Sequence, residues 1–309
     1  MSPAGAPARA ASASAPGRLE LSGRDGGPRL SLALDRRALS RVEPIAAGLE
    51  VESKESLTKA SARDVGELVE RSPGSLAAQA LALLGAPSGL RVVTEWKLPA
   101  GSGIHGAAAL ALATTAAVSR ALGQERGASE LIAVAREVGV RAGRVDEHGL
   151  HAALWGGVVL TRGDGGALEG ERLDLDPGRI DESLMVVDAG ETPDAGTGGG
   201  AGHAGEGGAG GLTGRIVEAL GSGRFEEVVD LVAEEASSVA LRPGQRRVVD
   251  LAREAGGAAR PLREGRLVVV WAPPGARGPG RREAVQAALQ AAGWKPLAVR
   301  LDLRGLELD

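Results

Sequence analysis

A glycine-rich segment, Leu98–Leu110 with the sequence LPAGSGIHGAAAL, joins a strand-like run to a long alanine-rich stretch. Glycines let a backbone approach phosphate closely, and the first amides of a helix have no internal partner and carry the positive end of the helix dipole. The pattern therefore predicts a cradle for nucleotide phosphates. An ordinary tight turn before a buried helix would show the same residues, and the motif alone leaves that alternative open.

Two familiar nucleotide motifs do not account for this loop. Gly101, Gly103 and Gly106 fit G-x-G-x-x-G, but residues 123–138, where a second strand with an acidic end should follow, are typical of a turn and a helix. No glycine loop in the chain is followed by Lys and then Ser or Thr, which excludes a P-loop. Neither a Rossmann unit nor a P-loop is predicted.

The composition excludes several classes of function. The formal charge of -4, the absence of Tyr and the single Phe leave no basic surface and no stacking platform, so we expect no nucleic-acid partner. Cysteine is absent and the four histidines form no H-E-x-x-H, so we expect no zinc enzyme. No apolar run reaches the roughly 18 residues of a membrane span. We expect no membrane partner and a cytoplasmic protein.

The first half of the chain must position the loop. The alternation of apolar and polar residues predicts strands at 17–22, 29–34, 38–51, 91–97 and 157–161. Apolar spacing and capping residues predict helices at 62–71, 75–84, 129–138 and 146–154. The stretch 104–122 carries no charge before Arg120, which predicts a helix buried on most of its circumference. This half is therefore mixed α/β.

The second half suggests a smaller α+β unit. Strands are expected at 183–188, 266–271 and 296–303, and helices at 214–220, 225–237, 244–255 and 281–292. The glycine- and alanine-rich run 192–211 cannot bury enough apolar surface to offset its ordering entropy, so we expect a flexible loop there. We expect a disordered leader at 1–14, one lobe at 15–176 and a second lobe at 177–309.

The glycine-rich loop resembles the phosphate loop of the GHMP kinases, the family of galactokinase, homoserine kinase and mevalonate kinase, whose pattern is P-x-x-x-G-L-G-S-S-A-A. The positions that match are Pro99, Gly103, Ala108 and Ala109, with Ile104 in place of leucine. The positions that depart from the pattern are His105, Gly106 and Ala107.

Three further segments resemble the family in the same chain order. Ala15–Leu21, with the sequence APGRLEL, is similar to its amino-terminal strand, and Asp35–Arg37 is similar to the end of its third strand. Gly143–Asp146 and the following Ala153–Gly157 resemble the segment that supplies its catalytic aspartate. The resemblance covers most of the chain from Ala15 onward and is weakest in the last third.

The resemblance implies a fold, a reaction and a set of ligands. The fold would be α+β and two-lobed, with an N-terminal α/β lobe like ribosomal protein domain 2 and a C-terminal ferredoxin-like lobe. The reaction would be transfer of the ATP γ-phosphate, with Mg²⁺, to an alcohol of a small metabolite such as a sugar or mevalonate. The partner would be that small-molecule alcohol, and the protein would be a monomer or a homodimer.

The resemblance also implies roles for individual residues. Asp146 would accept the substrate proton and Arg18 would keep it ionised. The nucleotide phosphates would lie against Pro99, Gly101, Ser102, Gly103, Ile104, His105, Gly106 and Ala107. Candidate residues for a substrate pocket are Arg24, Asp25, His148 and His151. Read without the family, Asp146 is an N-cap, Arg18 a strand arginine and the two histidines solvated helix positions.

Several departures from the family pattern favour a second hypothesis. Ala107 stands where most members have the serine that helps to hold Mg²⁺, with Ser102 or Thr114 as candidate replacements, so no metal ligand is assigned. The third family motif is reduced to Gly257–Arg266, which keeps Arg263 and Arg266 as candidate phosphate contacts. The alternative is a catalytically degenerate GHMP-fold protein, a ligand-binding or regulatory pseudokinase. The decarboxylase branch of the family also uses ATP and an aspartate, which leaves the net reaction open.

Overall fold

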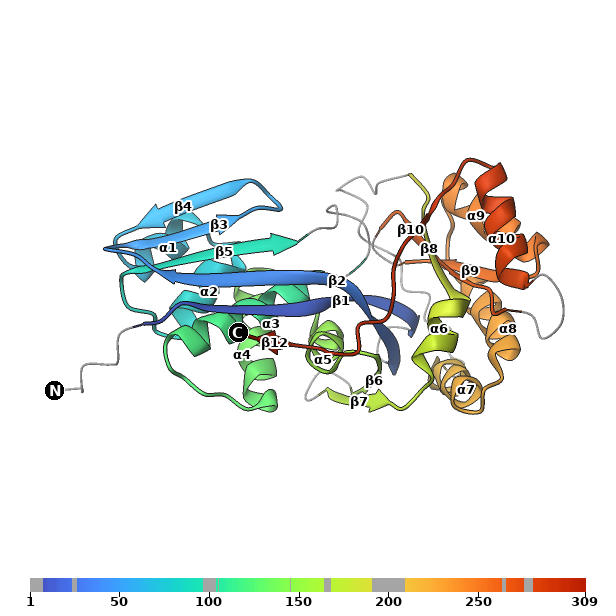
Figure 1. The fold of residues 1–309 in the computed structure, drawn as a ribbon, viewed down its shortest axis with the longest axis horizontal. Helices are drawn as coiled ribbons and strands as arrows, with labels where there is room; N and C mark the ends of the chain where they lie inside the picture. The colour runs from blue at the N-terminus through green and yellow to red at the C-terminus, as the bar shows by residue number, and fades with distance from the viewer. Residues whose placement is uncertain are drawn as a thin grey trace.

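The structure is a computed structural model that describes residues 8–23, 27–96, 104, 106–144, 146–163, 168–190, 209–262, 265–274 and 280–309. It forms two lobes side by side, with two long strands reaching from the first toward the second (Figure 1). Much of the predicted phosphate cradle and part of the predicted substrate pocket lie outside the described residues. The residues concerned are Pro99, Gly101, Ser102, Gly103, His105, Arg24 and Asp25.

The first lobe is built on an eight-stranded sheet in the order β12-β1-β2-β5-β3-β4, with β6 paired to β2 and β7 to β6. Its strands are β1 (Ala11–Gly23), β2 (Arg29–Pro44), β3 (Leu49–Ser53), β4 (Thr58–Ala62), β5 (Leu90–Trp96), β6 (Val158–Arg162), β7 (Glu169–Leu173) and β12 (Glu307–Leu308). The single strand expected at 38–51 is therefore the end of β2 and the start of β3.

Strand β1 begins earlier than expected. Ala11 and Ala13 are buried while Ser12 and Ser14 are partly exposed, the two-residue alternation of a strand with one covered face. Ala11 pairs with Val42 across β2. Residues 11–14, expected to belong to a disordered leader, are thus part of the sheet.

Five helices pack against one face of this sheet: α1 (Val65–Arg71), α2 (Leu76–Leu83), α3 (Gly106–Ala121), α4 (Ala128–Arg141) and α5 (Glu147–Trp155). Helix α3 is buried along nearly all its length, as its lack of charge predicted. It contacts both β1 and β2 and is flanked by α2, α4 and α5. The helix that follows the glycine-rich loop is therefore the centre of the lobe.

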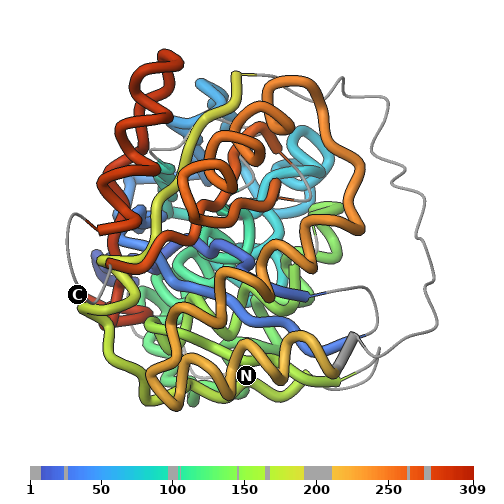
Figure 2. Tube along the Cα trace, turned by 90° about the vertical axis from the view of Figure 1, so that its right-hand side faces the viewer, coloured from blue at the N-terminus to red at the C-terminus, as the bar shows by residue number. Residues whose placement is uncertain are grey.

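The second lobe has a four-stranded sheet in the order β11-β8-β10-β9, made of β8 (Leu184–Asp188), β9 (Ala258–Pro261), β10 (Leu267–Trp271) and β11 (Pro296–Leu297). Helices α9 (Pro243–Glu254) and α10 (Arg281–Ala291) pack on one face. The other face contacts α6 (Pro177–Ser183), α7 (Ala209–Gly221), α8 (Phe225–Ala236) and the first lobe. Figure 2 views these helices from the side of the second lobe.

Alternation along β10 explains this layering. Leu267, Val269 and Trp271 belong to the apolar cluster shared with the first lobe, whereas Val268 and Val270 face α9 and α10. Such a strand, covered on both faces, is apolar throughout. Helix α7 begins at Ala209, inside the run 192–211 expected to be a loop, and residues 191–208 lie outside the described part of the chain.

The carboxy-terminal segment returns to the first lobe. Strand β12 pairs with β1, and the Asp302 amide donates to the Ala33 oxygen at 2.9 Å. The division into lobes at 176/177 stays a prediction, but these residues lie on the sheet of the first lobe. Within the described residues, no helix combines the length and apolar character needed to cross a membrane.

Candidate active site

Arg18 on β1 and Asp146 before α5 form a doubly bonded ion pair. Arg18 Nε donates to Asp146 Oδ2 and Arg18 Nη2 donates to Oδ1, both at 3.2 Å. The side chains are 1% and 11% exposed, respectively. A fork of two N–H···O bonds fixes the orientation of both groups as well as their charge. The two residues assigned to proton transfer by the resemblance therefore lie together.

A register irregularity in the pairing of β1 with β2 lies next to Arg18. The pairing of β1 with β2 shifts register between Pro16 and Gly17. Before this shift Ala13 and Ala15 belong to the core under the helices, and after it Leu19 belongs to the core shared with the second lobe. The extra residues of this irregularity, Asp35 and Arg36, lie in β2. Arg18 follows it on β1 and contacts Asp146 at the start of α5.

Asp146 is also the N-cap of α5. Its Oδ1 accepts a hydrogen bond from the Gly149 amide at 3.1 Å, so the capping interpretation and the pairing with Arg18 hold together. A Cβ on Gly149 would overlap the Asp146 carboxylate and lie 2.8 Å from Ala108 Cβ. Glycine at this position therefore lets the first turns of α5 and α3 approach each other. The carboxylate lies beside the helix that the glycine-rich loop opens.

Trp96 packs between β1 and the start of α3. It is the last residue of β5, and its indole lies between Gly17 of β1 and Gly106, the first residue of α3. A Cβ on Gly106 would lie 2.7 Å from Trp96 Nε1, and a Cβ on Gly17 would overlap the far edge of the same ring. Gly106, which departs from the family pattern, therefore has a packing reason. Ile104 is 5% exposed and packs in the apolar cluster between the lobes.

His148 lies near the pair and is held by Thr161. Its Nδ1 is 2.6 Å from Thr161 Oγ1, and that hydroxyl donates to the Arg29 oxygen at 3.3 Å. With the hydroxyl proton used there, Nδ1 carries the ring proton and Nε2 keeps a lone pair. Burial and then the charges of Arg29 and Arg18 lower the pKa of His148 to about 4. At neutral pH the ring is an uncharged hydrogen-bond acceptor.

His151 occupies a different environment. It is 7% exposed, and a Cβ on Gly170 of β7 would overlap its ring, so the imidazole packs against that strand. Burial lowers its pKa. Of the two histidines predicted for a substrate pocket, His148 is the one whose charge environment includes Arg18 and Asp146.

The described residues do not provide a magnesium site. No group of three or more His, Asp or Glu side chains among them has the geometry to hold a metal ion. Both Asp146 oxygens already face Arg18, and Thr114 lies eight residues into α3, about 12 Å along its axis. Mg²⁺ prefers oxygen ligands from carboxylates and phosphates. The donors among the described residues therefore do not fit the ion, and no chemical step is assigned to it.

The reduced third motif is largely structural where it is described. Residues 258–261 form β9, and Arg260 is fully buried between the lobes. Arg266, a candidate phosphate contact, pairs with Asp188 at 2.8 Å. Arg263 lies outside the described residues.

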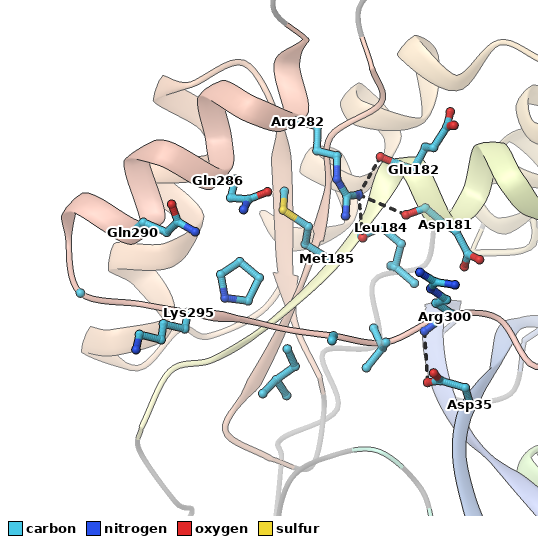
Figure 3. Close-up of a pocket in the computed structure, with 15 residues that line it drawn as sticks. Asp35, Asp181, Glu182, Leu184, Met185, Arg282, Gln286, Gln290, Lys295 and Arg300 are labelled. Atoms are coloured by element: carbon cyan, nitrogen blue, oxygen red, sulfur yellow. Dashed lines mark hydrogen bonds between the residues drawn. The ribbon is translucent and has the colours of Figure 1, made fainter.

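A large groove lies elsewhere, mainly on the second lobe with Asp35 of β2 at one end (Figure 3). It encloses about 920 Å³ beside α10 and the segment 293–300, and neither Arg18 nor Asp146 lines it. Arg282 lies at the upper edge of the groove. Its Nη1 donates to three backbone oxygens at 2.6–3.1 Å, those of Asp181, Glu182 and Leu184. Burial raises the pKa of Asp181, which accepts from the Leu301 amide. The groove and the ion pair are separate features.

Comparison with known proteins agrees with the resemblance. A family model described as the GHMP kinases N terminal domain matches residues 68–157, which include α3 and Asp146. The predicted resemblance to the GHMP kinases is therefore confirmed for this segment of the chain. No curated protein matches the chain in sequence.

Solved structures extend this likeness to the whole fold. A putative sugar kinase from Campylobacter jejuni superposes with a TM-score of 0.75 at 13% identity, covering 97% of this chain and 98% of that one. Galactokinase from Lactococcus lactis gives 0.73 at 12% identity over 97% and 95%. Homoserine kinase from Cytophaga hutchinsonii gives 0.67 at 17% identity over 97% of both chains. The two-lobed α+β GHMP kinase fold predicted from the sequence is confirmed.

Proposed function

We propose that the protein is an ATP-dependent kinase of GHMP type that transfers the γ-phosphate to an alcohol of a small metabolite. The observation that carries this proposal is the Arg18–Asp146 pair beside the first turn of α3. Phosphoryl transfer needs phosphate binding, charge stabilisation and a group that orients or deprotonates the hydroxyl. The loop, the start of α3, Arg18 and Asp146 supply these functions.

In the proposed reaction, Asp146 accepts the proton of the substrate hydroxyl as its oxygen forms a bond to the γ-phosphorus. The bond from that phosphorus to the bridging oxygen of ADP breaks, and ADP leaves with the electron pair. Arg18 stabilises the charge on Asp146 and on the reacting oxygens. ATP supplies the phosphoryl group, and amides at the start of α3 favour its negative charge.

The acceptor is proposed to be a sugar, mevalonate or a similar small alcohol. The structural neighbours are a sugar kinase, a galactokinase and a homoserine kinase, and this range at 12–17% identity supports the class and not one member of it. His148 is the proposed contact for an acceptor hydroxyl, because its Nε2 is a neutral acceptor close to Arg18 and Asp146. Arg24, Asp25 and His151 stay predicted pocket residues.

The test combines nucleotide binding with turnover. Ligand at about 100 times its Kd stabilises the native state by about 2.7 kcal/mol, so ATP should raise the melting temperature. A coupled ADP assay with sugars, mevalonate and homoserine should then find an acceptor, and Asp146→Ala should abolish turnover. No thermal shift at millimolar ATP, or full turnover in Asp146→Ala, would sink the proposal.

A pseudokinase is the second candidate, and two observations favour it. Ala107 offers no hydroxyl to a metal ion, and both oxygens of Asp146 are held by Arg18. If ATP stabilises the protein equally with and without Mg²⁺ and no acceptor yields ADP, this alternative replaces the kinase.

A further inference from the structure

Glu20, two residues from Arg18 on β1, lies among three arginines. Its Oε2 accepts from Arg18 Nη1 at 3.4 Å and from Arg29 Nη1 at 3.2 Å. Its Oε1 lies 3.6 Å from Nη2 of Arg260. The side chains of Arg18, Glu20 and Arg260 are each no more than 4% exposed. This buried carboxylate is thus held by strands of both lobes.

Arg260 is the contribution of the second lobe. It lies on β9, and its Nη1 donates to the Leu21 oxygen at 2.8 Å and to Glu235 Oε1 at 3.0 Å. The same Glu235 oxygen accepts from the Gly23 amide at 3.0 Å. Arg260 and Glu235 therefore form hydrogen bonds with the backbone of β1 just beyond Glu20. A continuous series of ion pairs runs from Glu235 through Arg260, Glu20 and Arg18 to Asp146.

The orientation of Arg18 depends on both ends of its guanidinium. Nε and Nη2 bind Asp146, while Nη1 donates to Glu20 and, at 2.9 Å, to Ser31 Oγ. A planar guanidinium bound on two sides cannot rotate without breaking one set of bonds. Glu20 and Ser31 therefore hold the side of the guanidinium opposite to Asp146.

Apolar packing already joins the two lobes without the charged side chains of Glu20 and Arg260. The apolar cluster that includes Leu19, Leu21, Val269 and Trp271 already joins the lobes. Burying charged groups carries a desolvation cost that packed apolar residues avoid, and replacing a buried ion pair with such residues is often neutral or stabilising. The charges buried at this junction therefore point to a role beyond cohesion.

We propose that Glu20 and Arg260 are positioning residues, through which the second lobe sets the orientation of Arg18 against Asp146. The inference rests on the proposed kinase function for its kinetic consequence. It assigns to the lobe junction a direct part in the geometry of the active site.

The first test compares two arginines that bridge distant parts of the chain. Arg260→Met should lower kcat by about 10- to 100-fold, because small misplacements of catalytic groups are costly, with KM for ATP unchanged within about twofold. Arg37→Met is the matched control, since Arg37 pairs with buried Asp302 away from Asp146. It should lower the melting temperature and leave kcat within about twofold of wild type. Equal kcat in folded Arg260→Met and wild type overturns the inference.

Two more variants keep the test decisive if Arg260→Met does not fold. Glu20→Gln preserves shape and removes the charge, and Arg260→Lys keeps a charge but loses the fork. Both should lower kcat, with Arg260→Lys less affected than Arg260→Met. If Arg260 acts through Glu20, the double variant Glu20→Gln/Arg260→Lys should cost less than the two single effects combined. Full additivity overturns the inference.

A spectroscopic measurement separates this inference from the proposed function. The ¹⁵N resonance of the Arg18 Nε–H, assigned by its loss in Arg18→Lys, should shift in Glu20→Gln and Arg260→Lys and stay in place in Arg37→Met. Such a pattern without any turnover in wild type would contradict the kinase and support the positioning. An unchanged Arg18 resonance in all three variants, with active wild type, would contradict the positioning alone.

Discussion

The Arg18–Asp146 region and the groove beside α10 differ in how far their charged groups bind one another. The groove encloses about 920 Å³, yet Arg282 at its edge is bound by backbone oxygens, and Asp35 and Asp181 accept from amides of the returning segment. In the Arg18 region the charged groups bind one another, and one guanidinium is shared between Asp146 and Glu20.

This difference shows that the large groove and the cluster of interacting charged side chains lie in different parts of the molecule. Charges bound to backbone groups end a helix or fasten a segment, and a ligand would have to break those bonds to use them. Charges that share partners need only small shifts to change how they divide their hydrogen bonds. Convergent charged groups, more than the volume of a hollow, therefore favour the Arg18–Asp146 region as the candidate active site.

Replacing one arginine in each region gives the largest expected contrast. Arg18→Met should lower activity by about 10²- to 10³-fold, because it removes electrostatic stabilisation from the reacting groups. Arg282→Met should leave activity within about twofold and lower the free energy of unfolding by about 1–3 kcal/mol, because it deprives three carbonyl oxygens of a donor. Turnover assays and urea unfolding of both variants measure the contrast.

The separation of the two regions is contradicted if Arg282→Met loses as much activity as Arg18→Met when the two variants are equally stable. The groove would then belong to the reaction, and the separation of the two features would have to be abandoned.

Replacing Gly149 of the first lobe tests the close approach of α5 to α3, and replacing Gly214 of the second lobe is the comparison. Gly149→Ala should reduce kcat about tenfold and cost about 1–3 kcal/mol of stability, because the new Cβ overlaps the Asp146 carboxylate. Gly214→Ala in α7 places its Cβ in open space and should stabilise the protein by about 0.5–1 kcal/mol. Unfolding and turnover are measured on both. Wild-type kcat in Gly149→Ala would show that Asp146 tolerates displacement.

The smallest effect concerns the pH dependence of stability at His148. Its pKa is about 4 in the folded protein, against 6.5 for an unperturbed histidine, so the unfolded chain binds a proton first as the pH falls. The stability from a neutral His148 is therefore complete above pH 6.5 and is lost as the pH falls toward 4. His148→Gln should make unfolding less sensitive to pH in this window. Identical pH profiles of the two proteins would contradict the assigned environment.

Local patterns predicted the elements that are uniform along their length. The uncharged stretch 104–122 became α3 at Gly106–Ala121, and the amphipathic stretch 244–255 became α9 at Pro243–Glu254. Elements that depend on distant partners were missed. Strand β12 has only two residues and forms because β1 offers an edge. The expected strand 296–303 reduces to β11 because the chain leaves the second sheet after Leu297.

The candidate site was likewise predicted only in part. Arg18 and Asp146 stood in segments that resemble the family, and the structure places them in contact. Glu20 and Arg260 gave no local signal, because a charged residue on a strand is ordinarily solvated and the two lie far apart in the sequence. Trp96 offered a weak signal as one of four tryptophans, placed directly before the glycine-rich loop in a chain that is only 2% aromatic.

The return of the chain to its first strand has a consequence for its synthesis. Ser12 donates a hydrogen bond to Asp309, a residue 297 positions later. At about 5–20 residues per second, β1 waits about 15–60 s after it is made before β12 can pair with it. During translation that edge of the sheet is open to other chains. Anything that shields β1 on the ribosome should therefore raise the yield of folded protein.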